Sequence, residues 1–372
     1  MRLLYRLAEP GDDAALRRLL ASVPMPGAVT VAFEREPEYF AAMRMSGREW
    51  QVLVAEEAGT GELAGVFCRS VQDRFVNGAR ERIAYWGQLR IARPYQGSVF
   101  LSRAFEFGRQ VYGNDPVDGN FAVIADENPL ARKVFAERRR RRFPPVLPVC
   151  RILTFGITLG RRWKSRHGRA RDAANAGLEL AAGTDVGLSR IVEFLRCRGA
   201  ARQLFPVYDE AYFAECGFDP AGFIVALRGG TIAGVAGLWD QSGCKQTVVR
   251  SYHGLLKFAR PFYNLLAPVG GYPPLPNAGE HIRSAYLSFI AVEDDAREAF
   301  AAILGEACRR AAAHGFAYLM LGLSEADPLA AIPRGLPHIP YTATLYTVEL
   351  HPGGPFRDRL DGRIPYIEIA TL

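Results

Sequence analysis

Apolar and polar positions alternate with a period of two along many stretches of the chain, while other stretches repeat apolar residues at helical spacing. In the first part of the chain this pattern predicts strands near 3–9, 51–56, 62–70, 81–92 and 120–125, a last hairpin near 147–158, and helices over 12–21, 36–45, 98–112 and 128–138. Further on it predicts strands near 178–182, 222–228, 232–239, 284–292, 316–323 and 341–350, and helices near 185–196 and 295–313. This order predicts a mixed α/β (α+β) fold, with mostly antiparallel sheets flanked by helices.

Short polar motifs indicate where some of these elements begin and end. Gly59-Thr60-Gly61 separates two predicted strands and indicates a hairpin turn. Asp12 and Asp185 each stand at the start of helical spacing, so both are predicted to be N-caps. Gly315 follows the predicted helix 295–313 and suits its C-terminal cap.

Several short segments of the first part of the chain recur in the second part, at one of two offsets. Leu63-Ala64-Gly65-Val66 matches Ile232-Ala233-Gly234-Val235 at an offset of 169 residues. Ile91-Ala92 matches Ile290-Ala291, and Asn128-Pro129-Leu130-Ala131 matches Asp327-Pro328-Leu329-Ala330, both at an offset of 199. Two matches that share one offset predict a duplicated domain. We expect copies at 1–158 and 178–372, joined by a basic linker over 159–177.

The change of offset from 169 to 199 predicts an insertion of 30 residues in the second copy, near 248–282. This insertion is apolar and aromatic and contains five prolines, so it cannot be one regular element. Two interpretations remain open. The insertion either forms a lid or channel wall over an apolar ligand, or it packs between the two copies.

Composition excludes several classes of protein. Apolar residues make up 49% of the 372 residues and charged residues 23%, as in ordinary globular proteins. No apolar run is long enough to span a membrane, and the first residues do not read as a secretory signal, so we expect a cytoplasmic protein. The six cysteines are scattered and predict neither a metal site nor a disulfide framework. No phosphate-binding GKS/T loop, GxSxG or HExxH motif occurs.

Positive charge is concentrated in one segment. Residues 132–171 hold 14 of the 46 Lys and Arg residues and one of the 39 acids, so the rest of the chain has a formal charge of 32 − 38 = −6. Such a segment could face the phosphates of a cofactor, a nucleic acid or a lipid surface. It could equally be a solvated linker, since 42 of the 46 basic residues in this chain are arginines.

The predicted order of elements, with LRIARPYQG over 89–97 before a helix and Asn128-Pro129-Leu130-Ala131 after a strand, resembles the GNAT superfamily of N-acyltransferases. The resemblance covers nearly the whole chain, as two tandem GNAT-like copies. It implies transfer of an acyl group from acetyl-CoA or another acyl-CoA to a small-molecule amine, without a metal. The apolar insertion suggests an acceptor or an acyl chain that is bulky or apolar.

The resemblance also implies where the cofactor lies. Free N–H groups at the start of the helix after 97 would bind the pyrophosphate. The implied cofactor-binding residues are Leu89, Ile91, Gln96, Gly97, Ser98, Val99, Phe100, Leu101 and Asn128. Val99 and Leu101 stand where the family has small residues. The matching loop of the second copy carries Glu293, Asp294 and Asp295, which would repel a pyrophosphate, so the cofactor is expected on the first copy.

Catalytic residues are harder to assign. Amine acylation needs a base for the ammonium proton and an acid for the leaving thiolate. In many family members the acid is a tyrosine at the position that Phe135 occupies here. The candidates near the predicted strand 81–92 are Glu81 and Tyr85, and His281 comes from the second copy. Glu280 and Tyr286 lie close to His281 in the sequence, whereas His253 reads as a loop residue and His314 as a helix-end cation.

Three functions remain open on this evidence. The first is an acyl-CoA-dependent N-acyltransferase. The second is a protein that kept the fold and binds a ligand without catalysis, which the altered loops favour. The third is a Fem-type transferase that uses aminoacyl-tRNA, in which the segment 132–171 would contact the nucleic acid with steep salt dependence.

Overall fold

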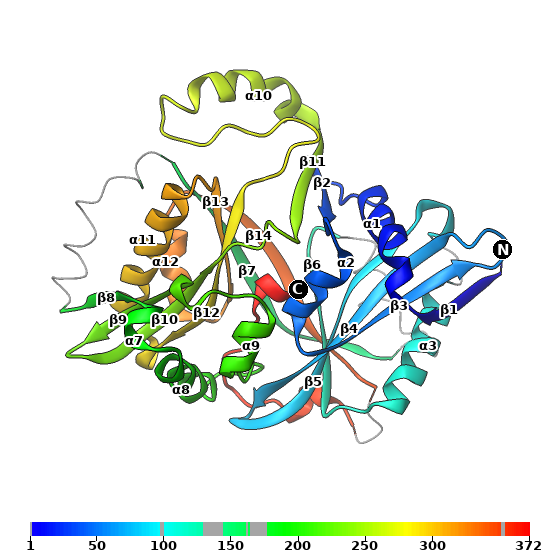
Figure 1. The fold of residues 1–372 in the computed structure, drawn as a ribbon, viewed down its shortest axis with the longest axis horizontal. Helices are drawn as coiled ribbons and strands as arrows, with labels where there is room; N and C mark the ends of the chain where they lie inside the picture. Colours follow the sequence, from blue (N-terminus) through cyan, green and yellow to red (C-terminus); the bar gives the residue numbers. More distant parts are fainter. Residues whose placement is uncertain (1, 97–99, 129–143, 161–162, 164–176, 351–353) are drawn as a thin grey trace.

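The fold is described from a computed structural model of the whole chain, which describes every residue except 1, 97–99, 129–143, 161–162, 164–176 and 351–353 (Figure 1). Three of the predicted cofactor residues, Gly97, Ser98 and Val99, lie outside the described residues. So do most of the predicted helix 128–138 and most of the basic segment 132–171. We call the residues up to 158 the first half and those from 178 the second half.

The first half begins with a strand, two helices and a long antiparallel meander. Its elements are β1 (Leu3–Leu7), α1 (Asp13–Ser22), β2 (Val29–Glu34), α2 (Tyr39–Met43), β3 (Glu49–Glu57), β4 (Leu63–Val76), β5 (Ala79–Ile91), α3 (Phe100–Asn114), β6 (Gly119–Ala125) and β7 (Val146–Thr158). The predicted turn at Gly59-Thr60-Gly61 is confirmed, because Gly61 donates a backbone hydrogen bond of 2.9 Å to Glu57 where β3 turns into β4.

The second half has a similar order with additional elements. Its elements are β8 (Glu179–Ala182), α7 (Gly183–Val186), α8 (Leu188–Gly199), α9 (Glu210–Glu215), β9 (Phe223–Arg228), β10 (Thr231–Trp239), β11 (Gln246–Tyr252), α10 (Gly254–Leu266), β12 (Ser284–Val292), α11 (Arg297–Ala313), β13 (Tyr318–Ser324), α12 (Ala331–Arg334) and β14 (His338–Val348). Helix α11 buries Phe300, Ile303 and Leu304 against the sheet, as its spacing predicts. Gly315 has a left-handed backbone conformation, with φ of +77°, at the point where α11 ends, so the predicted C-cap is confirmed.

The two halves share one sheet of twelve strands, in the order β1-β3-β4-β5-β6-β14-β7-β13-β12-β10-β9-β8. Only the β5–β6 and β12–β13 pairs among them are parallel, so the predicted mixed, mostly antiparallel sheet with flanking helices is confirmed. The last strands are exchanged. β14 pairs with β6 of the first half, β7 pairs with β13 of the second, and β7 and β14 pair with each other at the centre. The halves therefore do not have separate sheets.

Matching strands of the two halves also share a local irregularity. The register of β4 against β5 shifts next to Gln88, and that of β10 against β12 shifts next to Phe289. Both residues have positive φ, 56° and 57°. Such a bulge bends a strand and turns its edge away from the next strand. Each half thus has a parallel strand pair that separates after three residue pairs.

Several details differ from the sequence-based expectations, among them α9, β11, α10 and α12, which were not expected as elements. The stretch 147–158 forms one strand, β7, and not a hairpin, because its two sides pair with β14 and β13 instead of with each other. Strand β2 was not expected. Asp12 and Asp185 do not act as N-caps; each carboxylate instead accepts the backbone N–H three residues earlier, from Glu9 at 2.8 Å and from Ala182 at 3.4 Å.

One part of the insertion agrees with packing between the halves, and the other part is neither packed between them nor closed over them as a lid. Its first part, β11, pairs with β2 of the first half in a separate two-stranded sheet, so it packs between the halves. Its second part, α10 and the return segment after it, projects away from the rest of the molecule (Figure 1). None of the residues of α10 is buried.

Candidate functional site

A cavity of about 2960 Å³ lies between the two halves. The first half contributes β2, the end of β5, α3 and the end of β6 to its walls. The second half contributes the turn 240–245, β11, the start of β12 and the start of β13, and β7 and β14 line it from the centre of the sheet. Ligand pockets are more often 300–1,000 Å³, so this cavity has room for two ligands or one large one.

On the first-half side, the cavity enters the cleft between β5 and β6. These strands pair only at Ile83–Gly119, Ala84–Asn120 and Tyr85–Phe121. Beyond Gln88, β5 continues to pair with β4 alone, and β6 pairs with β14 on its other side. One backbone edge of each strand therefore faces the cavity without a strand partner. Backbone N–H and C=O groups on such an edge can pair with the amides of an extended ligand.

Helix α3 starts beside this open edge, and a glycine sets its position. The ring of Phe100, the first residue of α3, lies directly against Gly65 of β4. Leu89 and Ile91 of β5 pack in the same cluster as Phe100, Ala104 and Leu101. The first turn of the helix is thereby fixed close to the edge of β5.

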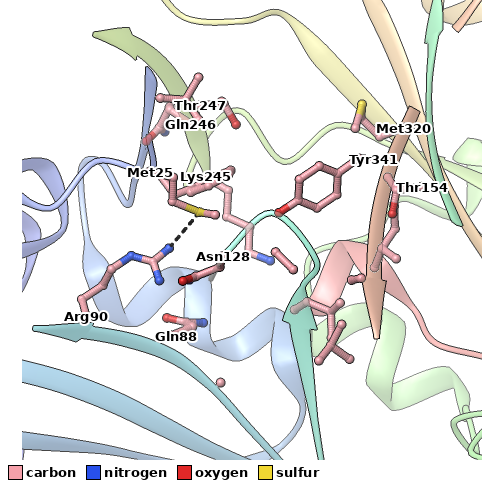
Figure 2. Close-up of a pocket in the computed structure, with 18 of the residues that line it drawn as sticks. Met25, Gln88, Arg90, Asn128, Thr154, Lys245, Gln246, Thr247, Met320 and Tyr341 are labelled. Atoms are coloured by element: carbon pink, nitrogen blue, oxygen red, sulfur yellow. Dashed lines mark hydrogen bonds between the residues drawn. The ribbon is translucent and has the colours of Figure 1, made fainter. Parts of the chain in front are cut away.

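The structure brings together the predicted cofactor residues that it describes. Six of the nine predicted residues are described, and all six line the cavity: Leu89, Ile91, Gln96, Phe100, Leu101 and Asn128. Gln96 uses its side-chain amide to donate to the carbonyl of Ile91 at 2.9 Å, which ties the loop to the end of β5. Asn128 extends from the end of β6 toward the same hollow (Figure 2).

The equivalent cleft of the second half is filled by the chain itself. Residues 366–370 lie against β12 and β13, where Ile369 packs against Gly322. Glu368 accepts the backbone N–H of Phe289 at 2.7 Å, and the hydroxyl of Tyr366 accepts that of Ile290 at 3.2 Å. The backbone N–H groups at the β12 bulge are thus hydrogen-bonded by the chain itself. The corresponding edge at the β5 bulge faces the cavity.

The loop before α11 is closed by ion pairs. Arg198 contacts Glu293 at 3.1 Å and Asp294 at 3.0 Å, and Arg202 pairs with Asp295. The three carboxylates at this helix start are therefore neutralised by the protein. Of the two corresponding clefts, the second-half one is filled and the first-half one opens into the cavity.

The three predicted catalytic residues lie in different places. Glu81, at the other end of β5, pairs with Arg359 at 2.7 Å and is not among the residues that line the cavity. Tyr85 lines the cavity beside the β5–β6 cleft, where its ring covers Gly87, and burial raises the pKa of its hydroxyl. His281 lies exposed at the rim on the second-half side. The structure therefore does not bring the three residues together.

The other candidates from the second half also border the cavity. Tyr286, at the start of β12, lines it, and burial raises the pKa of its hydroxyl. His253 lies at 2.9 Å from the Thr30 hydroxyl and 2.8 Å from that of Ser251, so it joins β2 to β11. Glu280 is held by the backbone and side chain of Asn277.

Three basic residues in the cavity wall were not singled out by sequence reasoning. They are Arg35, which follows β2, Arg90 of β5 and Lys245, which precedes β11. Figure 2 shows Arg90 and Lys245 reaching into the hollow from different elements, near Asn128 and Tyr341. Burial, and then the neighbouring Arg35, lowers the pKa of Arg90 and places that of Lys245 well below its usual value.

We find no candidate metal-binding cluster among the described residues. Within that part of the chain, no group of three or more His, Cys, Asp or Glu side chains could hold a metal ion. The six cysteines are free thiols, four of them buried. The site therefore offers backbone edges, aromatic and aliphatic walls, and cations.

No family model matches the sequence, and no curated protein matches it. Solved structures do match. The Saccharomyces cerevisiae N-myristoyltransferase with bound myristoyl-CoA is 10% identical, with 99% of this chain and 85% of that chain covered and a TM-score of 0.62. A GCN5-related N-acetyltransferase from Sphaerobacter thermophilus is 13% identical, covers 95% and 98% of the two chains, and has a TM-score of 0.55.

A third match is a GCN5-related glucosamine N-acetyltransferase region in a fungal multi-domain GH3 β-N-acetylglucosaminidase. It is 10% identical, with a TM-score of 0.57, and 93% of this chain spans 38% of that one. These matches over nearly the whole chain show that the protein has the GNAT fold, shared by GCN5-related N-acetyltransferases and N-myristoyltransferases.

Proposed function

We propose that this protein is an acyl-CoA-dependent N-acyltransferase whose acyl thioester binds in the first-half cleft between β5 and β6. The acceptor amine attacks the thioester carbonyl, a C–N bond forms as the C–S bond breaks, and the amine proton leaves as the CoA thiolate takes up a proton. Edge N–H and C=O groups of β5 would hold the cofactor, and the first turn of α3 would face its pyrophosphate.

One observation carries this proposal: the same cleft is open in the first half and filled in the second. In the second half the chain's own residues 366–370 occupy the cleft, whereas in the first half the edge of β5 faces the cavity and has no strand partner beyond Tyr85. The fold neighbours include an enzyme with bound myristoyl-CoA and N-acetyltransferases, which supports acyl-CoA as the co-substrate class. The cavity is large enough for an acyl chain longer than acetyl, or for an acceptor larger than a small amine, and this supports one or the other.

We further propose that the chain consists of two copies of one unit, at 1–158 and 178–372, with 159–177 as linker. The strand order, the paired bulges and the exchange of the last strands all support this division. In this arrangement the second copy supplies the acceptor side of the cavity. The cytoplasmic location expected from the sequence stays a prediction.

The experiment is calorimetric titration of CoA, acetyl-CoA and longer acyl-CoAs into the protein and a Leu101→Glu variant. Leu101 lies in the first turn of α3 and lines the cavity, so a carboxylate there would repel the pyrophosphate. Two like charges about 6 Å apart near a protein surface repel by roughly 3 kcal/mol, so we expect binding to weaken at least about tenfold.

The matched control is Gln110→Glu, which makes the same change of charge on an exposed position of the same helix that does not line the cavity. It is expected to bind acyl-CoA like the unmodified protein. Binding that both substitutions weaken equally would reflect long-range charge and would contradict the proposed position. Absence of binding by any acyl-CoA would favour a ligand-binding protein without acyl transfer.

A further inference from the structure

Three cations gather at one place in the cavity wall without an ion pair to a carboxylate of the described residues, and the nearest acidic influence on Lys245 is the buried Glu368. Arg35 is 7% exposed, and its Nε has no hydrogen-bond partner. Arg90 donates to its neighbour's carbonyl, Leu89 O, at 2.9 Å and lies over the ring of Phe33. Lys245 donates to the carbonyl of Ala370 at 2.6 Å. Among the described residues, no carboxylate forms an ion pair with any of the three, although four acids line the same cavity: Glu127, Asp219, Asp240 and Glu280.

The β2–β11 pairing brings two of these cations close together. Glu34 at the end of β2 pairs with Gln246 at the start of β11, and Arg35 and Lys245 are the residues directly beyond this pair. Gln246 fixes this crossing by hydrogen bonds to the backbone of Glu36, at 2.9 Å and 2.8 Å. Burial lowers the pKa of Lys245, and Arg35 lies close enough to the lysine to lower it further. The fold therefore keeps two like charges near each other, which is unfavourable in the absence of an anion.

Two other buried arginines of the same chain have partners within the protein: Arg74 donates to the carbonyl of Leu204 at 2.8 Å, and Arg69 binds a carboxylate. Arg69 is fully buried, and its guanidinium binds the carboxylate of Asp115 at 2.7 Å and the side chain of Gln51 at 2.8 Å. This is the usual outcome, because an unpaired buried charge costs several kcal/mol. Sheltered arginines without a carboxylate partner, together with a lysine whose pKa is well below its usual value, indicate a site prepared for an external anion.

The side of β5 on which this cluster lies separates it from the proposed cofactor site. Residues on a strand alternate between its faces. Leu89 and Ile91 pack toward α3, whereas Arg90 lies between them and contacts Met25 and Phe33 on the side of β2. An anion bound by Arg90 is thus on the opposite face of β5 from the first turn of α3.

We propose that Arg35, Arg90 and Lys245 form an oxyanion-binding site that holds a carboxylate or phosphate group of the acyl acceptor. The assignment to the acceptor rests on the proposed function, whereas the anion site itself does not. Arginine binds both groups with paired N–H donors, and hydrogen bonds to charged groups are about twice as strong as neutral ones. The acceptor would therefore be an amine that also carries a negative charge.

The test compares pairs of amines that differ in one anionic group: ethanolamine with phosphoethanolamine, and phenethylamine with phenylalanine. Binding is measured by the shift of the melting temperature and by calorimetry, and acyl transfer is measured separately. We expect the anionic member of at least one pair to bind at least about tenfold more tightly. The pair that shows the difference identifies phosphate or carboxylate as the group. Anion-dependent binding without acyl transfer would support the anion site and contradict the proposed function.

The decisive variant is Arg35→Met. It is expected to abolish the preference for the anionic amine and to leave unchanged or raise the melting temperature of the ligand-free protein, because it removes an uncompensated buried charge. The matched variant Arg69→Met removes a paired charge and is expected to lower the melting temperature. A loss of stability in Arg35→Met as large as in Arg69→Met, or equal binding of charged and neutral amines, would overturn the proposal.

A second inference concerns the α10 hairpin, by which we mean residues 253–279. The outward face of α10 and the turn after it carries large apolar side chains that are 65–88% exposed: Leu255, Phe258, Phe262, Leu265, Leu266 and Val269. The polar side chains face inward. Asn264 hydrogen-bonds both backbone groups of Leu275, the hydroxyl of Tyr263 donates to Pro273 O at 3.1 Å, and Arg260 donates to Asn277 at 2.6 Å.

The polarity of this helix is thus the reverse of that of a helix on a soluble surface, whose apolar face points to the core. The charged residues around this helix are also all basic. No Asp or Glu occurs over the 39 residues from 241 to 279, which include Lys245, Arg250, Lys257 and Arg260. The described helices include none long and apolar enough to cross a membrane. A short helix with Phe and Leu on its outer face and only basic charges fits the surface of an anionic bilayer.

We infer that the α10 hairpin binds an anionic lipid surface by inserting this apolar face. The return segment contributes Leu275 and Pro276 to the wall of the cavity, so binding would bring the cavity close to the membrane. The test is co-sedimentation with vesicles of phosphatidylcholine alone and with about one third phosphatidylglycerol. We expect binding at least about tenfold tighter to the anionic vesicles, and loss of it in the Phe258→Ser, Phe262→Ser double variant.

The control is the Leu4→Ser, Leu7→Ser double variant, which removes two exposed leucines from β1 and is expected to bind vesicles normally. Equal sedimentation of the hairpin variant and the unmodified protein would overturn the inference. So would a dimer in light scattering that the hairpin variant converts to a monomer, because the face would then bind a second copy of the chain.

Discussion

Replacing Glu368 by alanine is expected to lower the free energy of unfolding by about 3–5 kcal/mol. Glu368 is 2% exposed, and its carboxylate accepts hydrogen bonds from Phe289 N at 2.7 Å, the Tyr366 hydroxyl at 2.8 Å and Ala370 N at 3.2 Å. Alanine would leave buried donors without an acceptor and remove the contact that keeps the second-half cleft filled. Equilibrium unfolding in urea, followed by tryptophan fluorescence, measures the change as a shift of the midpoint.

Glu325→Ala is the control for this substitution. Glu325 is half exposed and pairs with Arg151 at 3.1 Å on the surface, and such pairs contribute about 1 kcal/mol or less. We expect its midpoint to stay close to that of the unmodified protein. If both substitutions shift the unfolding midpoint by similarly small amounts, the hydrogen bonds of Glu368 do not hold the second-half cleft closed.

Most strands were predictable because each has its own local pattern. The alternation of apolar residues located β3, β5 and β10 from their own sequence, and the repeated segment around Gly65 and Gly234 predicted that the halves share an order of strands. Strand β2 was missed because the short apolar run at 29–34 follows prolines and a glycine and pairs with β11, more than 200 residues away. A local pattern carries no information about such a partner.

The exchange of β7 and β14 could not be predicted for a related reason. Periodicity tells which side chains of a strand face the core, but not which strand it pairs with. β7 and β14 are the last strands of their halves, so the exchanged and unexchanged arrangements satisfy the same pattern. The stretch 147–158 was therefore interpreted as a hairpin.

The position of part of the cavity wall was predictable from the sequence, and the cluster of cations was not. The predicted cofactor residues that the structure describes come from one continuous stretch and one motif, and all six line the cavity, although their role stays a prediction. Arg35, Arg90 and Lys245 come from three separate segments, and in a chain with 42 arginines an unpaired one looks like any other. The signal available was the lysine: Lys245 is one of four, at the start of a long stretch without acids.

Gly65→Ala is expected to weaken acyl-CoA binding by about tenfold or more and to destabilise the fold by about 1–3 kcal/mol. A Cβ at position 65 would overlap the ring of Phe100 and lie 2.8 Å from the carbonyl oxygen of Arg90. Because Phe100 begins α3, the helix start beside the open edge of β5 would have to move. Calorimetric titration of acyl-CoA and thermal unfolding measure the two effects.

The repeat supplies the matched control, Gly234→Ala at the equivalent position of the second half. There a Cβ would meet only the ends of side chains, Val292 Cγ1 at 3.0 Å and Ile303 Cδ1 at 3.1 Å, which can shift. We expect a smaller loss of stability and unchanged acyl-CoA binding, because the second-half cleft is already filled. If Phe100 is the cause, Phe100→Leu should partly restore acyl-CoA binding to Gly65→Ala. Equal losses of acyl-CoA binding in the two glycine variants would mean that the first-half cleft is not where the cofactor binds.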